Sequence, residues 1–321
     1  MRFVVLGAGA VGGVLGARLH QAGFDVELIA RGAHFRAIRD RGLTFETPSE
    51  RVALPIPVHE SPASISWGVD DVVLLTVKSQ DTAAALSGLR ASAPPDVPVV
   101  CMQNAVENER LALRLYPDVY GAVVMAPTAH LEPGAVLAYG SLLSGIIDLG
   151  RYPSGIDERA REISAAIAAS SFESEACADV MRLKYAKLIV NLGNIVHAIC
   201  ESGEKADELV ELAREEGRAA LAAASIDSVA DAVGDVASRW ARLGVAEIDG
   251  RERSGSSTWQ SFARGVGAVE TDYLNGEIVL LGRQHGLATP VNARLCELAA
   301  RLARERAEPG SLPAREILAA A

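Results

Sequence analysis

The sequence lacks the features that mark several large classes of protein. No stretch approaches the roughly 18 uninterrupted apolar residues of a membrane-spanning helix. The four cysteines lie far apart and form no CxxC pair, which argues against a disulfide framework or a zinc site. Acidic residues outnumber basic ones, 41 to 31, so we do not expect a nucleic-acid partner. The six histidines show no ligand spacing, and we predict no metal.

Aromatic side chains are scarce as well, at 5% of the chain, although apolar residues as a whole reach 49%. The cores should therefore be aliphatic and rich in helix. A chain of 321 residues is too long for one ordinary α/β layer system and suits two domains. The apolar segment Met1–Leu6 lacks the length and the cleavage site of a signal peptide. We expect a cytoplasmic protein that does not bind membranes.

The first half of the sequence alternates apolar runs with helical patterns. The apolar runs are typical of parallel strands buried on both faces: Phe3–Leu6, Val26–Ile29, Val72–Leu75 and Val97–Val100. Helical spacing covers Val11–Ala22, Val106–Leu115 and Ile156–Ala169. This alternation predicts an α/β fold with a Rossmann-type, doubly wound sheet. Further on, Glu132-Pro133-Gly134 predicts a hairpin turn.

From about Ala178 onward, strand patterns disappear and helical runs follow. They cover Val180–Cys200, Ala206–Ala224, Ser228–Leu243, Thr271–His285 and Asn292–Arg304. The break near residues 170–174 predicts a dinucleotide-binding Rossmann domain over residues 1–173. An all-α domain with substrate-binding and catalytic residues is expected over residues 174–321.

The motif Gly7-Ala8-Gly9-Ala10-Val11-Gly12 follows the first strand and opens the first helix. In such a loop the first glycine permits the turn, the second lets a pyrophosphate approach the backbone, and the third lets helix and strand pack closely. A glycine-rich turn without a ligand is the alternative. The context favours a dinucleotide site.

The end of the second strand indicates which nicotinamide cofactor binds. NAD sites usually carry an acidic residue there, whereas this chain has Ala30-Arg31, and Glu27 lies before the strand end. The Arg31 guanidinium suits a 2′-phosphate, so we predict NADPH. A solvated surface charge is the alternative for Arg31.

Two further polar residues follow predicted strands at the edge where such sheets bind ligands. Lys78 comes after the strand Val72–Leu75, and Asn104 comes after the strand near Val97–Met102. Each alone is typical of a solvated loop. Together they suit a nicotinamide ribose and a substrate carboxylate.

A polar stripe runs along one apolar helix of the second half. Lys184, Lys187, Asn191 and Asn194 recur at spacings of three, four and three, which places them on one face. A partly buried lysine has a lowered pKa and is suited to donate a proton near neutrality. A surface stripe on an amphipathic helix remains the alternative. Farther along, Glu270 opens a predicted helix, where a carboxylate is ordinarily a partner of the helix dipole.

These segments together resemble the ketopantoate reductases (2-dehydropantoate 2-reductases) over essentially the whole chain. The resemblance rests on the order and spacing of Gly7–Gly12, Val77-Lys78, Gln103-Asn104, Lys187–Asn191, and Ser257 followed by Glu270–Gly276. It implies an oxidoreductase that uses NADPH to reduce a 2-keto acid to a 2-hydroxy acid. In the family this is ketopantoate to pantoate, in pantothenate and coenzyme A synthesis.

The resemblance also implies roles for residues of the second half. Lys187 matches the family's catalytic lysine, the general acid, and Asn191 matches a substrate-binding asparagine. Ser257 would contact the substrate carboxylate. Glu270 would lie beside the cofactor and the active centre, and we group it with Lys187 as catalytic. Asn194 is the candidate for a second substrate-binding asparagine.

In the first half, the resemblance implies cofactor contacts. Lys78 and Asn104 match such contacts, and Asn104 also lies near the substrate in the family. Ala129 falls where the family has a small residue against the nicotinamide. The glycine loop and Arg31 complete the expected cofactor site.

The sequence departs from the family pattern at three places. Ala105 replaces the glycine of Gln-Asn-Gly. Ile195 stands where the second helix asparagine is usual, with Asn194 one residue early. The spacing from Ser257 to Glu270 is one residue longer. These changes affect substrate contacts more than cofactor contacts.

Three hypotheses therefore stay open. The chain is a ketopantoate reductase, a reductase of the same family for another branched 2-keto acid or related carbonyl compound, or a non-catalytic NADP sensor. A sensor needs no proton donor, so Lys187 favours the enzymes. A homodimer is compatible with the alanine-rich helices.

Overall fold

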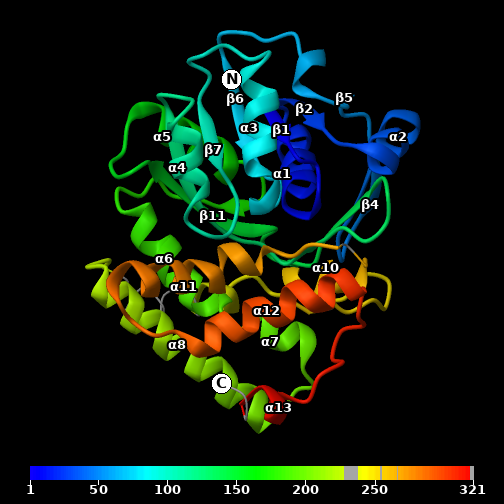
Figure 1. Cartoon of the computed structure of the whole chain (residues 1–321). Coiled ribbons are helices and arrows are strands. Elements are labelled where there is room, and N and C mark those ends of the chain that lie inside the picture. Colours follow the sequence, from blue (N-terminus) through cyan, green and yellow to red (C-terminus); the bar gives the residue numbers. More distant parts are fainter. Residues whose placement is uncertain (228–237, 254, 266, 319–321) are drawn as a thin grey trace. The chain divides into compact units, whose positions relative to one another are not determined.

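The computed structural model describes residues 1–227, 238–253, 255–265 and 267–318, and these form two compact units (Figure 1). Unit 1 comprises the described residues 1–181 and 238–253, and unit 2 comprises residues 182–227, 255–265 and 267–318. The grouping of residues 238–253 with unit 1 was not anticipated from the sequence. The domain boundary at residue 173 stays a prediction.

Unit 1 is built on an eight-stranded sheet of order β12-β11-β8-β7-β6-β1-β2-β5. Its strands are β1 (Arg2–Leu6), β2 (Asp25–Ile29), β5 (Val58–His59), β6 (Asp71–Leu75), β7 (Val99–Cys101), β8 (Val119–Met125), β11 (Gly145–Arg151) and β12 (Phe172–Glu173). The strands from β8 to β5 are parallel, and β11 pairs with β8 in antiparallel fashion. The strand order turns back at β1, which is where open α/β sheets bind ligands.

The apolar runs form this sheet because both of its faces are covered. In β1, Phe3 and Val5 enter one apolar core while Val4 and Leu6 enter the other. The helices of unit 1 are α1 (Ala10–Gln21), α2 (Gly32–Arg41), α3 (Thr82–Arg90), α4 (Asn108–Leu113) and α5 (Glu158–Ala168), with short 3-10 turns η1 (Pro62–Ser64) and η2 (Ser79–Asp81). Apolar residues of α1 and α5 lie in the first core, and those of α3 and α4 lie in the second. The predicted doubly wound sheet is confirmed.

A second, four-stranded sheet was not predicted. Its order is β4-β3-β10-β9, with β3 (Leu43–Glu46), β4 (Arg51–Leu54), β9 (Thr128–Ala129) and β10 (Ala135–Ala138). The predicted turn Glu132–Gly134 joins β9 and β10, which pair in antiparallel fashion, and Gly134 adopts a φ of 87°. Strands of two to four residues are too short for their periodicity to be read.

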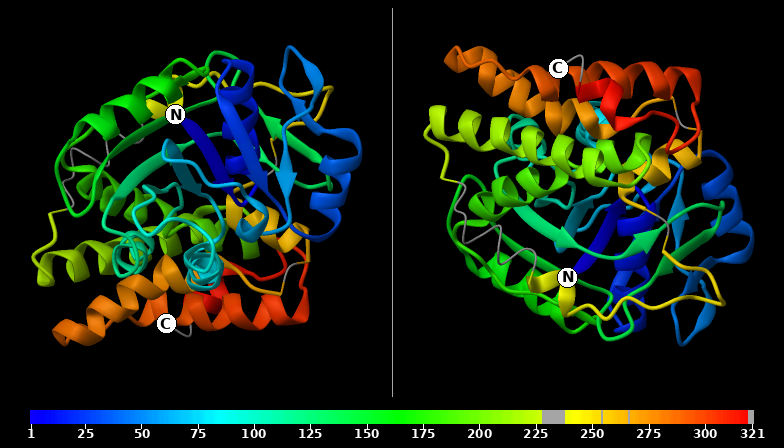
Figure 2. Two further views of the ribbon diagram at one scale, coloured as in Figure 1. Left: turned by 90° about the horizontal axis from the view of Figure 1, so that it is seen from above. Right: turned by 90° about the horizontal axis from the view of Figure 1, so that it is seen from below.

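Unit 2 is helical in its described residues, as expected. Its helices are α6 (Val180–Asn191), α7 (Asn194–Ile199), α8 (Glu204–Ala223), α10 (Ser257–Ala263), α11 (Asn275–His285), α12 (Pro290–Glu305) and α13 (Ala314–Leu318), with a 3-10 turn η3 (Glu270–Tyr273). The longer helices α8, α11 and α12 pack against one another (Figure 2). No helix within the described ranges is long and apolar enough to cross a membrane.

Two helices that the sequence predicted as continuous are each divided into two elements in the structure. The predicted helix Val180–Cys200 is interrupted between α6 and α7, and the predicted helix from Glu270 to His285 begins as the separate turn η3. Of the predicted helix Ser228–Leu243, residues 228–237 lie outside the described part of the chain. The interruption before Asn194 has a consequence for the site, because the polar stripe then spans two helices.

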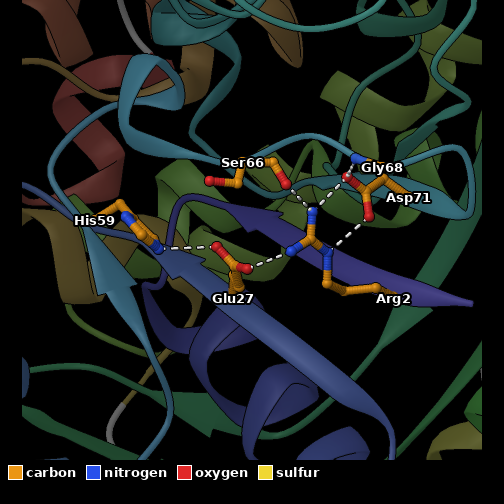
Figure 3. Close-up of polar contacts among 6 residues, drawn as sticks. All are labelled: Arg2, Glu27, His59, Ser66, Gly68 and Asp71. Carbon is orange, nitrogen blue, oxygen red and sulfur yellow. Dashed lines mark hydrogen bonds and ion pairs between the residues drawn. The ribbon is translucent and has the colours of Figure 1, made fainter.

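An ion-pair network joins four parallel strands of unit 1 (Figure 3). The guanidinium of Arg2 makes a bidentate pair with Asp71, at 2.7 Å and 2.6 Å, and also pairs with Glu27, which contacts His59 at 2.8 Å. Arg2 and Asp71 are the first residues of β1 and β6, so this pair lies at the edge opposite the carboxyl ends. The hydrogen bond to Asp71 raises the pKa of Arg2. The Arg2–Asp71 pair therefore ties β1 to β6 at the amino ends of these strands.

Removing the Arg2 guanidinium should destabilise the fold. The Asp71 side chain is 2% exposed, so Arg2→Met leaves a buried carboxylate with only the Gly68 amide as its remaining donor in the network. We expect the free energy of unfolding to fall by about 2–3 kcal/mol, measured by urea denaturation. Arg39→Met is the matched control, because Arg39 pairs with Asp40 on the surface, and it should leave the unfolding curve unchanged. Equal stability of both variants would contradict a structural role for the network.

Candidate active site

The predicted glycine loop lies between the carboxyl end of β1 and the first turn of α1. Gly7 has a φ of 114°, and a Cβ atom there would lie 2.8 Å from the Val77 nitrogen. A Cβ on Gly12 would overlap the Gly7 carbonyl and the Thr76 hydroxyl. By contrast, a Cβ on Gly9 would meet no atom within 4 Å. The first and third glycines are therefore required by packing, and the second leaves open space.

This arrangement fits a pyrophosphate. Gly9 is the N-cap of α1 and no side chain caps the helix, so the partial positive charge of the helix N-terminus lies beside the open space at Gly9. The Thr76 hydroxyl donates a hydrogen bond to the Gly7 carbonyl at 2.7 Å, which ties the end of β6 to the loop. Thr76 is a positioning residue that the sequence interpretation did not single out.

Arg31 lies where the prediction placed it, directly after β2. It is the N-cap residue of α2, and its side chain is exposed. Glu27, the acidic residue of β2 closest to this end, forms an ion pair with Arg2 of β1 and contacts His59 of β5. The end of β2 therefore presents a guanidinium, which suits a phosphate rather than a ribose hydroxyl.

The two loops that carry Lys78 and Asn104 are brought together by a buried polar cluster. Lys78 is the N-cap of η2, and the next residue, Ser79, donates to the Asn104 carbonyl at 3.4 Å. The Asn108 side chain donates to the same carbonyl at 2.9 Å and to Ser79 at 3.2 Å. It also accepts from the Thr82 hydroxyl at 2.7 Å. Asn108 is fully buried and holds both loops in place, a role that the sequence interpretation missed.

Alanine at position 105, where the family commonly has glycine, strains the backbone. Ala105 has a φ of 67°, the left-handed region that an alanine adopts unfavourably, whereas glycine adopts it freely. This explains why a glycine suits this turn. The cluster around Asn108 holds the adjacent Asn104 carbonyl and so keeps the strained turn in place.

Restoring glycine at this turn should stabilise the protein. Ala105→Gly removes the left-handed strain but adds entropy to the unfolded chain, so we expect a net gain of about 0.5–1 kcal/mol in the free energy of unfolding. Ala91→Gly is the control, because Ala91 is exposed with a φ of -72° and gains no relief. Thermal unfolding of both variants measures the difference. A destabilised Ala105→Gly protein would contradict the strain.

Ala129 is the remaining candidate of unit 1. It lies in β9 and is 3% exposed, in a small apolar cluster with Leu137, Tyr139 and Ile248. The helix α1 packs against β9, which keeps this strand near the glycine loop. Its contact with a nicotinamide stays a prediction.

In unit 2, Lys187 and Asn191 lie one turn apart on α6, and Lys184 lies one turn before them. Lys184 is 4% exposed and Asn191 is 9% exposed, so this face is largely buried. Burial lowers the pKa of Lys187 to about 7, the Lys184 ammonium lowers it as well, and the Glu270 carboxylate opposes this shift. A lysine that titrates near neutrality is suited to proton transfer.

The structure also brings other predicted residues of unit 2 together. Glu270 is the first residue of η3, is 6% exposed, and acts electrostatically on Lys187. Ser257 opens α10, and its neighbour Ser256 donates a hydrogen bond to the Asn194 carbonyl at 3.3 Å. The substrate-binding candidates Asn194 and Ser257 therefore lie at adjoining helix starts.

The interruption between α6 and α7 is held by a buried amide network. Asn275 donates to the Leu192 carbonyl at 3.1 Å and to the Asn292 side chain at 2.9 Å. Asn292 in turn donates to Glu216 at 2.8 Å. These asparagines are fully buried. They fix the place where the helix that carries Lys187 ends. In the local sequence, Gly193 is the only residue at positions 192–193 that indicates this helix end.

Comparison with known proteins agrees with this geometry. The fold and the glycine loop define a dinucleotide-binding α/β unit together with a helical unit. A family model described as "Ketopantoate reductase PanE/ApbA" matches residues 3–154, and the corresponding C-terminal model matches residues 179–303. The chain belongs to the ketopantoate reductase family.

Similar proteins span nearly the whole chain. The 2-dehydropantoate 2-reductase of Pyrococcus horikoshii is 29% identical, covering 93% of this chain and 96% of that protein. The enzyme of the same name from Caulobacter vibrioides is 30% identical over 92% and 96%. A crystal structure of a family member from Ralstonia eutropha JMP134 superposes with a TM-score of 0.81 at 30% identity, covering 95% and 99%. A D-mandelate dehydrogenase solved with NADH and anilino(oxo)acetate shares the fold, with a TM-score of 0.81 at 23% identity over 95% and 99%.

Proposed function

We propose that this chain catalyses the NADPH-dependent reduction of 2-dehydropantoate to pantoate, with Lys187 as the general acid. The observation that carries the proposal is the partly buried lysine on α6 whose pKa burial lowers to about 7. The resemblance to the family implies a catalytic role for this lysine, and the Glu270 carboxylate acts on it electrostatically. Membership of the ketopantoate reductase family and relatives named 2-dehydropantoate 2-reductase support the substrate.

Unit 1 provides groups that suit NADPH. The open space at Gly9, in front of the N-terminus of α1, suits the pyrophosphate, and Arg31 suits the 2′-phosphate. Lys78 and Asn104, held by the Asn108 cluster, are the proposed contacts for the nicotinamide half, with Ala129 as a further contact. When bound, NADPH supplies the hydride that reduces the ketone carbon.

Lys187 and Glu270 handle the proton. As negative charge develops on the carbonyl oxygen, the Lys187 ammonium stabilises it and then donates its proton to form the alcohol. The Glu270 carboxylate opposes the effect of burial and so keeps a larger fraction of Lys187 protonated. Asn191, Asn194 and Ser257 are the proposed donors to the substrate carboxylate and hydroxyl, with Asn104 as a further contact.

One assay distinguishes the proposed activity from reduction of another 2-keto acid and from cofactor sensing without catalysis. Absorbance loss of NADPH with a panel of 2-keto acids should give the highest kcat/KM for 2-dehydropantoate. A higher kcat/KM for another branched 2-keto acid would assign a different substrate within the family. Binding of NADPH without any turnover would favour a sensor.

Replacement of Lys187, the proposed general acid, should strongly lower the rate of keto-acid reduction. Lys187→Ala should lower kcat by about 10²–10⁴-fold while NADPH still binds. For the wild type, kcat/KM for the keto acid should be constant below pH 7 and fall tenfold per pH unit above it, because the acid must be protonated and its pKa is about 7. Lys205→Ala, on the exposed surface of α8, is the control and should retain full activity. A flat pH profile with an active Lys187→Ala enzyme would remove Lys187 from the mechanism.

Arg31 should determine the preference for NADPH. Loss of its charged contact to the 2′-phosphate should raise KM for NADPH by roughly 10–100-fold in Arg31→Ala and leave KM for NADH unchanged. Arg41→Ala, at the exposed far end of the same helix, should change neither value. Steady-state kinetics with both cofactors measures the ratio. Equal KM values for the two cofactors in the wild type would contradict the assignment.

A further inference from the structure

The imidazole of His34 connects three segments of unit 1. Its Nε2 atom lies 2.7 Å from the Ala8 carbonyl oxygen in the glycine loop. Its Nδ1 atom accepts a hydrogen bond of 2.8 Å from the Gly134 amide in the β9–β10 turn. The residue itself lies on α2, three positions after Arg31. One half-buried side chain thus contacts the loop, the turn and the helix start.

These contacts define the protonation of the ring. A backbone amide can only donate, so Nδ1 must present its lone pair to Gly134. The proton of a neutral ring is then on Nε2, where it donates to the Ala8 carbonyl. Burial lowers the pKa of His34, while the hydrogen bond to Ala8 opposes this shift, and a lowered pKa agrees with a neutral ring. Both nitrogens are therefore used.

The hydrogen bond to Ala8 fixes the orientation of a peptide in the glycine loop. The Ala8 amide donates to the Ile29 carbonyl at 3.0 Å, and the Gly9 amide donates to the Gly7 carbonyl at 2.8 Å. The contact with His34 adds a partner for the Ala8 carbonyl, in a residue that is 2% exposed. The peptide that leads into Gly9 is thus held from both sides, at the point where the open space begins.

The second contact joins the hairpin turn to α2. Gly134 has a φ of 87°, and a Cβ atom there would lie 2.8 Å from the Ala37 Cβ, so the turn packs directly on the helix. The His130 ring, from the same hairpin, lies 4.1 Å from the His34 ring between centroids. The position of α2, and of Arg31 at its start, is therefore coupled to this hairpin.

We propose that His34 is a positioning residue of the cofactor site, which fixes the Ala8–Gly9 peptide beside the open space proposed for the pyrophosphate and fixes the start of α2 beside the proposed place of the 2′-phosphate. The inference rests on the proposed binding of NADPH and adds a residue outside the glycine motif and Arg31. It predicts that loss of the imidazole weakens dinucleotide binding rather than the chemical step.

The test compares His34→Ala, which removes both hydrogen bonds, with His34→Gln, whose amide keeps one donor and one acceptor at about the spacing of the ring nitrogens. Fluorescence titration gives Kd for NADPH and NADH, and initial rates at saturating NADPH give kcat and KM for the keto acid. For His34→Ala we expect Kd to rise about tenfold for NADPH, corresponding to two net hydrogen bonds, and by a smaller factor for NADH, which has no 2′-phosphate. We expect kcat and KM for the keto acid to stay within twofold of wild type. His34→Gln should regain most of the affinity.

His285→Phe, at the exposed end of α11, is the control and should bind as wild type. Wild-type affinity in His34→Ala would overturn the inference while leaving the proposed function intact. It would also be overturned if His34→Gln lost affinity and kcat together with a drop in Tm, because His34 would then act only on folding. A wild-type protein that binds neither cofactor would overturn the proposed function, and this inference with it.

Discussion

The close approach of α1 to the carboxyl ends of β1 and β6 is the constraint on which the architecture of unit 1 depends. It requires Gly12 to lie against the Gly7 carbonyl and the Thr76 hydroxyl, where no side chain fits. Since β1 lies between β6 and β2 in the sheet, the loops that follow these strands emerge beside this contact. The open space at Gly9, the guanidinium of Arg31 and the loops of Lys78 and Asn104 all belong to this edge of the sheet. The Arg2–Asp71 pair lies at the amino ends of β1 and β6, so this contact and the proposed ligand site lie at different edges of the sheet.

In unit 2, the corresponding constraint is the desolvation of an ammonium group. Burial and the charge of Lys184 disfavour protonated Lys187, whereas Glu270 favours it, and the balance is a pKa of about 7. An ordinary surface lysine titrates above pH 10 and is a poor proton donor at neutrality. The helix that carries Lys187 ends where the Asn275 side chain donates a hydrogen bond to the Leu192 carbonyl. A buried amide network far from this helix in sequence thus positions the proposed acid and its neighbours.

Much of unit 1 was predictable because its signals are local. Continuous apolar runs with a glycine turn identify buried parallel strands, and their ends lie within two residues of the predicted positions. The four-stranded sheet was missed, since its strands are short and pair across distant segments such as β3 and β10. The break after α6 was missed because Asn275, 83 residues further along the chain, stabilises it. His34 was missed for the same reason, because its partner Gly134 lies 100 residues away. The candidate site residues came from local motifs and from the resemblance to the family, whereas the residues that position them depend on tertiary contacts.

The proposed reaction transfers a hydride to the ketone carbon of 2-dehydropantoate and a proton to its oxygen. The most direct measurement incubates the enzyme with 2-dehydropantoate and NADPH that carries deuterium at both C4 positions, and analyses the product by mass spectrometry and NMR. We expect pantoate with a single deuterium atom, bound to the carbinol carbon and absent from the hydroxyl after exchange into water. Pantoate without deuterium at that carbon, or unchanged 2-dehydropantoate alongside protein that binds NADPH, would contradict it.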